Sequence, residues 1–201
     1  MDNTLRKLRG LNFAPRWSSQ PMIRREYVVE HSYWVALYSA ILAYMWNIYG
    51  DNRPLNIIDA MMAGALHDAE EATTGDLPAL AKRRIPEAWQ KLSNDIMDET
   101  FDTTGEFGST VSWLKLCAKM SHGSSTDEYN LTIAKIVKAA DLLSALMYLK
   151  EEETAGNSYV HELIVEIAQA TRQIELPGLH ELLDRMAFMP PPRPKDFISH
   201  L

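Results

Sequence analysis

The sequence has few of the features that mark secreted, nucleic-acid-coating or membrane-bound proteins. Cys117 is the only cysteine among 201 residues, so an internal disulfide is excluded and nothing points to secretion. The formal net charge of -7 argues against a protein that coats nucleic acid or an anionic membrane, because both tasks need a broad basic face. The N-terminus also lacks the apolar core of a signal peptide. We therefore expect a cytoplasmic protein that binds neither a nucleic acid polymer nor a membrane.

A long hydrophobic run is missing as well. The segment from Tyr33 to Tyr49 carries no charged side chain, but it is shorter than the roughly 20 predominantly apolar residues that a membrane span needs. We expect this segment to form a buried central helix. Hydrophobic residues make up 46% of the chain and charged residues 23%, which predicts a folded protein with one sizeable core. We expect a single domain over residues 1–201.

Turn residues divide the chain into helical segments, and neither a repeat nor a ladder of strands is visible. We predict an all-α fold, a globular bundle of helices. The proline-rich run at 190–194 predicts an extended surface tail. Helices are expected at residues 30–48, from Pro54 to about 74, and at 86–101, 111–120, 131–154, 160–174 and 178–189.

Two histidines and two aspartates are arranged so that they can share one metal ion. His67 and Asp68 close an apolar helical run, and adjacent side chains on a helix point about 100° apart, so other helices must supply the remaining ligands. His31 and Asp141 lie on two such helices. A charged aspartate in an apolar helix is costly to bury alone, which favours a cation beside Asp141. On spacing alone, a capped helix with a satisfied core histidine explains the same residues.

The order of these residues resembles the signature of the HD-domain phosphohydrolases, which is a histidine, a distant His-Asp pair and a later aspartate around one ion. The local sequence is closer still to the YfbR-type 5′-deoxynucleotidases, a branch of similar length. The resemblance covers roughly the first three quarters of the chain, and after Gly156 only the helical character matches. The resembling motifs are Arg16-Trp17, Arg24-Arg25-Glu26, Glu30-His31-Ser32, His67-Asp68-Ala69-Glu70-Glu71, Thr74-Gly75-Asp76-Leu77-Pro78 and Lys138-Ala139-Ala140-Asp141.

The resemblance implies an HD-domain helical bundle with a metal-site core at about residues 27–156, followed by helices and a tail over 157–201. Imidazole and carboxylate ligands suit a first-row divalent ion, for which we expect Co, Mn or Zn. Glu71 comes four residues after His67, so on a continuous helix it shares a face with that histidine and is placed for proton transfer. A solvated carboxylate is the alternative for Glu71. The implied metal ligands are His31, His67, Asp68 and Asp141.

The resemblance also implies substrate-binding residues. Asp76 is expected to bind the 3′-hydroxyl of the sugar, and we group it with Glu71 as catalytic; its alternative is a turn residue. Arg16 and Trp17 are expected to help select deoxyribose, although Trp17 can also be a simple hydrophobic anchor. Basic side chains expected to meet phosphate oxygens are Lys82, within the run Lys82-Arg83-Arg84, and Lys138.

These features predict a metal-dependent phosphohydrolase in which water attacks the α-phosphorus of a 2′-deoxynucleotide and the deoxynucleoside leaves. The main hypothesis is a 5′-deoxynucleotidase that acts on monophosphates. The basic run after Asp76 leaves open a dATP triphosphohydrolase like the small HD enzymes of bacteriophages, and a scaffold that binds a nucleotide without turnover is the second alternative. A phosphodiesterase is less favoured, because no further histidine pair at ligand spacing is present for a second metal. We expect a homodimer or higher homo-oligomer in a bacterial cell or a phage-infected host.

Overall fold

Helices make up the regular structure of the chain in the computed structural model, which describes residues 2–50, 53–122 and 126–188. Within these ranges there is no strand, only an isolated β-bridge between Pro15 and Tyr27, so the predicted all-α fold is confirmed. In chain order the elements are α1 (Asp2–Leu8), η1 (Arg9–Phe13), α2 (Val28–Tyr49), α3 (Ile57–Ala65), α4 (Glu71–Thr74), α5 (Ala79–Arg84), α6 (Pro86–Thr100), α7 (Gly108–Met120), α8 (Glu128–Thr154), η2 (Ser158–Val160), α9 (His161–Arg172) and α10 (Leu179–Phe188).

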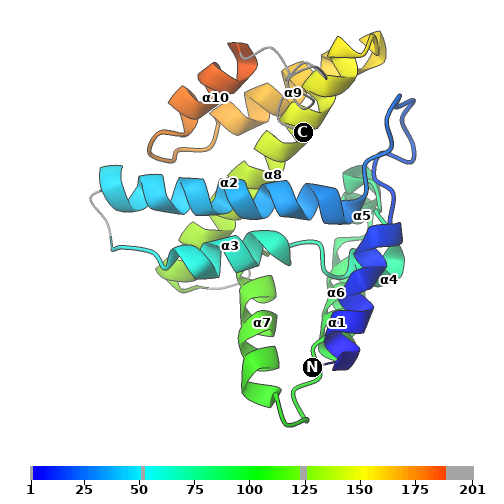
Figure 1. The fold of residues 1–201 in the computed structure, drawn as a ribbon, viewed down its shortest axis with the longest axis vertical. Coiled ribbons are helices and arrows are strands. Elements are labelled where there is room, and N and C mark those ends of the chain that lie inside the picture. Colours follow the sequence, from blue (N-terminus) through cyan, green and yellow to red (C-terminus); the bar gives the residue numbers. More distant parts are fainter. Residues whose placement is uncertain (1, 51–52, 123–125, 189–201) are drawn as a thin grey trace, which may run out of the picture.

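The main core is built around the two long helices α2 and α8. Figure 1 shows α2 running across the molecule with α3 beside it and α8 passing behind it. α2 packs against both of these helices, α8 also packs against α9, and α7 packs against α3. Buried side chains such as Val35 and Leu42 of α2 and Ile136 and Leu143 of α8 fill the interior. Burial of this apolar surface is the main force that holds helices from distant parts of the chain together.

A second apolar cluster supports the segment that follows α3. Met97 and Phe101, at the end of α6, pack with residues of α7 and with Leu66 and Ala69. Leu66 and Ala69 flank His67 and Asp68 in the sequence, and both are buried in this cluster. The pair is therefore anchored on each side by hydrophobic contacts.

One predicted helix is in fact two. We expected a continuous helix from after Pro54 to about residue 74, but α3 ends at Ala65, residues 66–70 form turns, and α4 begins at Glu71. The Nδ1 atom of His67 lies 2.8 Å from the carbonyl oxygen of Gly64. If the helix continued, that oxygen would instead accept from the backbone N–H of Asp68. The prediction that His67 and Glu71 share one helix face is therefore wrong.

The other predicted helices agree with the observed ones to within three residues at each end. Helices α1 and α5, with 7 and 6 residues, were not predicted, because such short elements show little apolar periodicity. The predicted tail at 190–194 lies outside the described residues. In the part of the chain that is described, no helix combines the length and apolar character that a membrane crossing requires.

The close contact between α2 and α3 depends on Gly64. A methyl group at this position would lie 2.6 Å from Ser39 Oγ and 2.9 Å from the carbonyl oxygen of Val35, both on α2. Glycine thus lets the two helix backbones approach each other, and the carbonyl group of the same residue contacts the His67 ring. The packing of the two helices and the position of His67 are linked through one residue.

We predict that Gly64→Ala lowers the free energy of unfolding by about 1–3 kcal/mol, because the added methyl group forces α2 and α3 apart. Gly105→Ala is the matched control, since a methyl group there meets nothing within 4 Å, and we expect a change of less than about 0.5 kcal/mol. Urea denaturation followed by circular dichroism measures both values. Equal midpoints for the two variants would contradict the prediction.

Candidate metal and phosphate site

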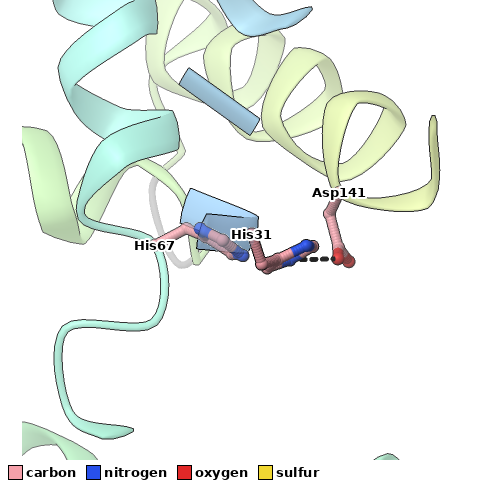
Figure 2. A group of neighbouring side chains, drawn as sticks. All are labelled: His31, His67 and Asp141. Atoms are coloured by element: carbon pink, nitrogen blue, oxygen red, sulfur yellow. Dashed lines mark ion pairs between the residues drawn. The ribbon is translucent and has the colours of Figure 1, made fainter. Parts of the chain in front are cut away.

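Three side chains from separate parts of the chain meet in the interior. Figure 2 shows His31 from α2, His67 from the turn after α3 and Asp141 from α8 pointing toward one another. One ligand atom from each residue lies within 4.8 Å of the others, and both histidines are buried. The spacing of these atoms is small enough for a single metal ion to bind all three.

The second nitrogen of each imidazole is already engaged. His67 Nδ1 lies 2.8 Å from the Gly64 carbonyl oxygen, which only accepts, so Nδ1 must carry the proton and donate it. His31 Nδ1 lies 2.9 Å from Ser144 Oγ, one turn after Asp141 on α8. The Nε2 atoms of both histidines are buried and have no hydrogen-bond partner. A metal-binding histidine has a buried ring nitrogen directed at the ion while its second nitrogen is held by such a contact, so the site fits a metal ion.

Two carboxylates stand beside these nitrogen atoms. Asp141 Oδ1 is 3.2 Å from His31 Nε2, and Asp68 Oδ2 is 3.0 Å from His67 Nε2. The structure therefore brings all four predicted ligands together, although Asp68 adjoins the compact group of three through His67 rather than belonging to it. Neither contact satisfies the nitrogen atom as a hydrogen bond would.

The charges of the site favour a cation at its centre. Burial lowers the pKa of His31 to about 4, which keeps that ring neutral. Burial opposes a charge on His67 too, but Asp68 and Asp141 outweigh it and raise the pKa of His67 to about 9. Despite its own burial, Asp141 keeps a pKa well below its ordinary value, because His31 and Lys138 stabilise its charged form. The ionised carboxylates thus stabilise positive charge at the centre of the group, which the proton on His67 Nε2 carries and which a metal ion would supply in its place.

An open pocket of about 510 Å³ lies over the two carboxylates, and it collects the predicted residues. His31 and His67 do not line it; they are buried and contact two of its lining residues, Asp68 and Asp141. Apolar side chains also line the pocket, namely Leu77, Pro78, Leu80 and Leu163. Leu163 lies on α9. Eight of the ten sequence-predicted site residues line the pocket, namely Arg16, Trp17, Asp68, Glu71, Asp76, Lys82, Lys138 and Asp141.

Glu71 is a buried carboxylate at this pocket. Its Oε1 atom accepts from Lys82 Nζ at 2.6 Å, and its Oε2 atom has no partner. Burial and the charge of Asp68 raise the pKa of Glu71 to about 8, against the opposing effect of Lys82. The Lys82 ammonium also lies 4.9 Å from the centre of the Trp89 ring, a cation–π contact that holds it near the carboxylate. The predicted alternative, a solvated Glu71, is excluded by its burial.

Arg16 and Trp17 are positioned by a carboxylate that the sequence reasoning missed. Oε2 of the buried Glu26 accepts from Arg16 Nη1 at 2.8 Å and from Trp17 Nε1 at 2.9 Å. The backbone N–H of Trp17, a residue with a φ of 59°, donates to Asp76 Oδ2 at 3.1 Å. The Trp17 ring stacks on Tyr148 with centroids 5.9 Å apart. Glu26 belongs to a resembling motif, and that motif was the available signal.

The segment between η1 and α2, which carries Arg16 and Trp17, is fastened to the end of α8. The two oxygens of Glu152 accept from the backbone N–H groups of Ile23 at 2.6 Å and Arg24 at 2.7 Å. Asn157 donates to Glu152 at 2.9 Å and to the Pro21 carbonyl group at 2.8 Å. The Tyr148 hydroxyl donates to the carbonyl group of Arg24. The pocket wall therefore depends on a buried carboxylate outside the site.

Known proteins resemble this chain in sequence and in fold. The chain matches the family described as 5′-deoxynucleotidase YfbR-like over residues 3–189. A 5′-deoxynucleotidase of Erwinia tasmaniensis is 31% identical in an alignment 158 residues long, which covers 75% of this chain and 73% of the relative. A 5′-deoxynucleotidase of Photobacterium profundum is 30% identical in an alignment 174 residues long, which covers 84% of this chain and 80% of the relative. The crystal structure of the PH0347 protein from Pyrococcus horikoshii OT3 shares the fold, with a TM-score of 0.69 at 22% identity over 92% of this chain and 98% of the other.

We predict that Glu152→Gln lowers the free energy of unfolding at pH 7 by about 2 kcal/mol, because charge-assisted hydrogen bonds to the segment are lost. Burial alone would raise the pKa of Glu152, but its donors lower it below the ordinary 4.5. The stabilisation is therefore complete above pH 4.5 and disappears as the pH falls through the lower, folded-state pKa. The difference between wild type and variant should shrink on acidification.

Chemical denaturation at pH 7 and at decreasing pH values measures this difference. Glu151→Gln is the control, because the neighbouring Glu151 is half-exposed and its ion pair with Arg24, at 3.3 Å, is worth about 0–1 kcal/mol. A Glu152→Gln protein as stable as wild type at pH 7 would refute the role of Glu152 in holding this segment.

Proposed function

The chain belongs to the YfbR-like 5′-deoxynucleotidase family, a family of hydrolases, and from that membership we propose that it hydrolyses 2′-deoxynucleoside 5′-monophosphates to deoxynucleosides and phosphate. The observation that carries this proposal is the pair of buried, unpartnered Nε2 atoms beside two carboxylates under an open pocket. A metal site of this kind, with cations around it, suits a phosphate ester. It favours an enzyme over a scaffold that only binds a nucleotide.

We assign the ion to His31, His67, Asp68 and Asp141, and Co, Mn or Zn suits their nitrogen and oxygen atoms. When bound, a divalent ion supplies Lewis acidity and makes a water molecule acidic enough to act as a nucleophile near neutral pH. The four ligand residues would place the ion next to the core of the helical bundle. Because they come from three separate parts of the chain, the site depends on intact tertiary packing.

We assign proton transfer and phosphate binding to side chains around the ion. We assign proton transfer to Glu71, whose buried carboxylate has a pKa suited to exchanging a proton near neutral pH. Arg16, Lys82 and Lys138 are assigned to phosphate oxygens, since all three line the pocket.

We assign the sugar to the wall of the pocket formed by Arg16 and Trp17, which hydrogen bonds to Glu26 hold in place. Trp17 presents its ring there, and Asp76, fixed through one oxygen by the Trp17 backbone, has a second oxygen for the 3′-hydroxyl. A 2′-hydroxyl would add bulk and an unsatisfied polar group against this wall, which favours a deoxyribose.

A triphosphate is the second candidate substrate. Three cations line the pocket, more than one phosphate group needs, and Lys82 continues into a basic run. Each cation is already paired, however: Arg16 with Glu26, Lys82 with Glu71, and Lys138 with Asp141 at 2.8 Å. This pairing leaves less positive charge for a long phosphate chain, so we rank the monophosphate first. We further propose a cytoplasmic homo-oligomer as the working form.

Incubation of metal-loaded protein with dAMP, dGMP, dATP and dGTP tests the substrate. We expect phosphate from the monophosphates and no product from the triphosphates, with products identified by chromatography. Chelation of the metal and, separately, Asp68→Ala should each abolish turnover, because both remove charge stabilisation at the phosphorus. Intact triphosphate released from dATP would replace the monophosphate proposal, and full activity of Asp68→Ala would refute the metal mechanism.

We predict that Glu71→Gln lowers kcat by about 10²- to 10⁴-fold without reducing the metal content, because an amide keeps the shape but exchanges no proton. Glu70→Gln is the matched control, since Glu70 is equally buried, at 2%, but does not line the pocket. We expect at most a few-fold change for the control. Steady-state rates and metal analysis of both variants give the comparison, and similar rates for the two would remove Glu71 from the reaction.

A further inference from the structure

A second cavity of about 620 Å³ lies beside the candidate site, between α2, α8 and the segment that precedes α2. We call it the rear pocket. Within the described ranges of the chain, it shares no lining residue with the pocket over the two carboxylates. Its volume is typical of small-molecule sites, which measure about 300–1,000 Å³. Four aromatic side chains line it, namely Tyr33, Trp34, Tyr38 and Tyr148.

Three residues of the rear pocket contact residues of the candidate site. Glu26 accepts from the indole N–H of Trp17 at 2.9 Å, and the ring of Tyr148 stacks on the same indole. Ser144 Oγ lies 2.9 Å from Nδ1 of His31, a proposed metal ligand. A molecule in the rear pocket would therefore touch the side chains that orient the sugar wall and the metal site.

The carboxylates of the rear pocket already have cationic partners. The Arg24 guanidinium lies 3.3 Å from a Glu151 oxygen and 3.7 Å from a Glu30 oxygen, and Glu26 is paired with Arg16. A ligand therefore does not need to bring a positive charge. A phosphate group would meet three carboxylates and one guanidinium that is already paired, so these charges disfavour a nucleotide.

The aromatic rings offer a surface for a planar ligand. Tyr33 and Trp34 meet edge to face with centroids 5.4 Å apart, and Trp34 and Tyr38 lie nearly parallel at 6.2 Å. Tyr33 is 60% exposed and Trp34 is 47% exposed, so their rings are accessible to a ligand. An aromatic base stacks well on such rings, and the oxygens of Glu30 and Glu151 can accept from amino or hydroxyl groups.

We propose that the rear pocket binds an uncharged nucleoside, with the base against Trp34 and the sugar hydroxyls near Glu30 and Glu151. The lining supplies the preference for an uncharged aromatic ring. The choice of a deoxynucleoside rests on the proposed function, because that compound is the product released at the candidate site. A bound deoxynucleoside would restrain Tyr148 and Glu26, and with them the Trp17 wall, so that product leaves more slowly and kcat falls.

Calorimetric titration of the metal-loaded wild-type chain with deoxyadenosine tests the binding. Trp34→Ala should weaken a binding step by about 10-fold or more, within the range that one base–aromatic stack contributes. Val29→Trp should weaken the same step, because a larger side chain there fills the pocket. Trp113→Ala is the matched control and should bind as wild type does, since Trp113 is 37% exposed and lies outside the rear pocket.

Two results overturn the proposal. The first is a wild-type chain that does not bind deoxyadenosine, or wild type, Trp34→Ala and Val29→Trp chains that bind it equally. The second concerns the chemical class of the ligand. If tetramethylammonium binds to wild type and not to Trp34→Ala, while deoxyadenosine binds to neither, the rear pocket is a site for an organic cation.

The effect on turnover is measured separately, with dAMP as substrate and deoxyadenosine added. In the wild type and in Trp113→Ala, saturating deoxyadenosine should lower kcat by about twofold or more, because exchange of product is slowed. In Trp34→Ala it should raise only the KM, by competition at the candidate site. An equal fall in kcat in all three chains overturns the feedback role. A lack of turnover in every chain, wild type included, would count against the proposed function and leave the calorimetric result standing.

Discussion

The contact between His67 Nδ1 and the carbonyl group of Gly64 links the fold to the site more directly than any other. The ring occupies the carbonyl oxygen of Gly64, which would otherwise accept the next hydrogen bond of α3. The helix therefore ends at Ala65, and His67 lies outside it. The contact also engages Nδ1, so that Nε2 faces Asp68 in the interior. Gly64 at the same time allows α3 to pack closely on α2, the helix that carries His31. Helix packing and ligand geometry therefore cannot be altered independently.

Most of the charged side chains that line the pocket form ion pairs with one another or with a neighbouring carboxylate. Each cation that lines the pocket contacts a carboxylate, and two of these carboxylates also contact other elements: Glu26 accepts from Trp17, and Asp141 contacts His31. Fixed pairs orient donors before a ligand arrives, which lowers the reorganisation that binding requires. The same pairs limit the net positive charge that the pocket presents. A small dianionic phosphate fits such a balance better than a long polyphosphate chain.

Much of this arrangement follows from sequence pattern. Apolar periodicity located the long helices, and the four proposed ligands stood out as polar groups in apolar surroundings, as Asp141 does on α8. The break after Ala65 could not be predicted, because a side chain rather than a proline or glycine ends the helix there. Glu26, Ser144 and Glu152 escaped notice for a related reason. Their roles depend on which atoms they face across distances of 9 to 129 residues in the chain.

The uncharged stretch of α2 shows which part of a helix's burial the sequence pattern predicts. Its lack of charge predicts a buried central helix, and the inner face does bury Val35 and Leu42 and carries His31 at 0% exposure. The outer face, from Tyr33 to Ile48, is left to solvent in the single chain. Because His31 lies on the inner face, its position depends on the packing of α2 against α3 and α8.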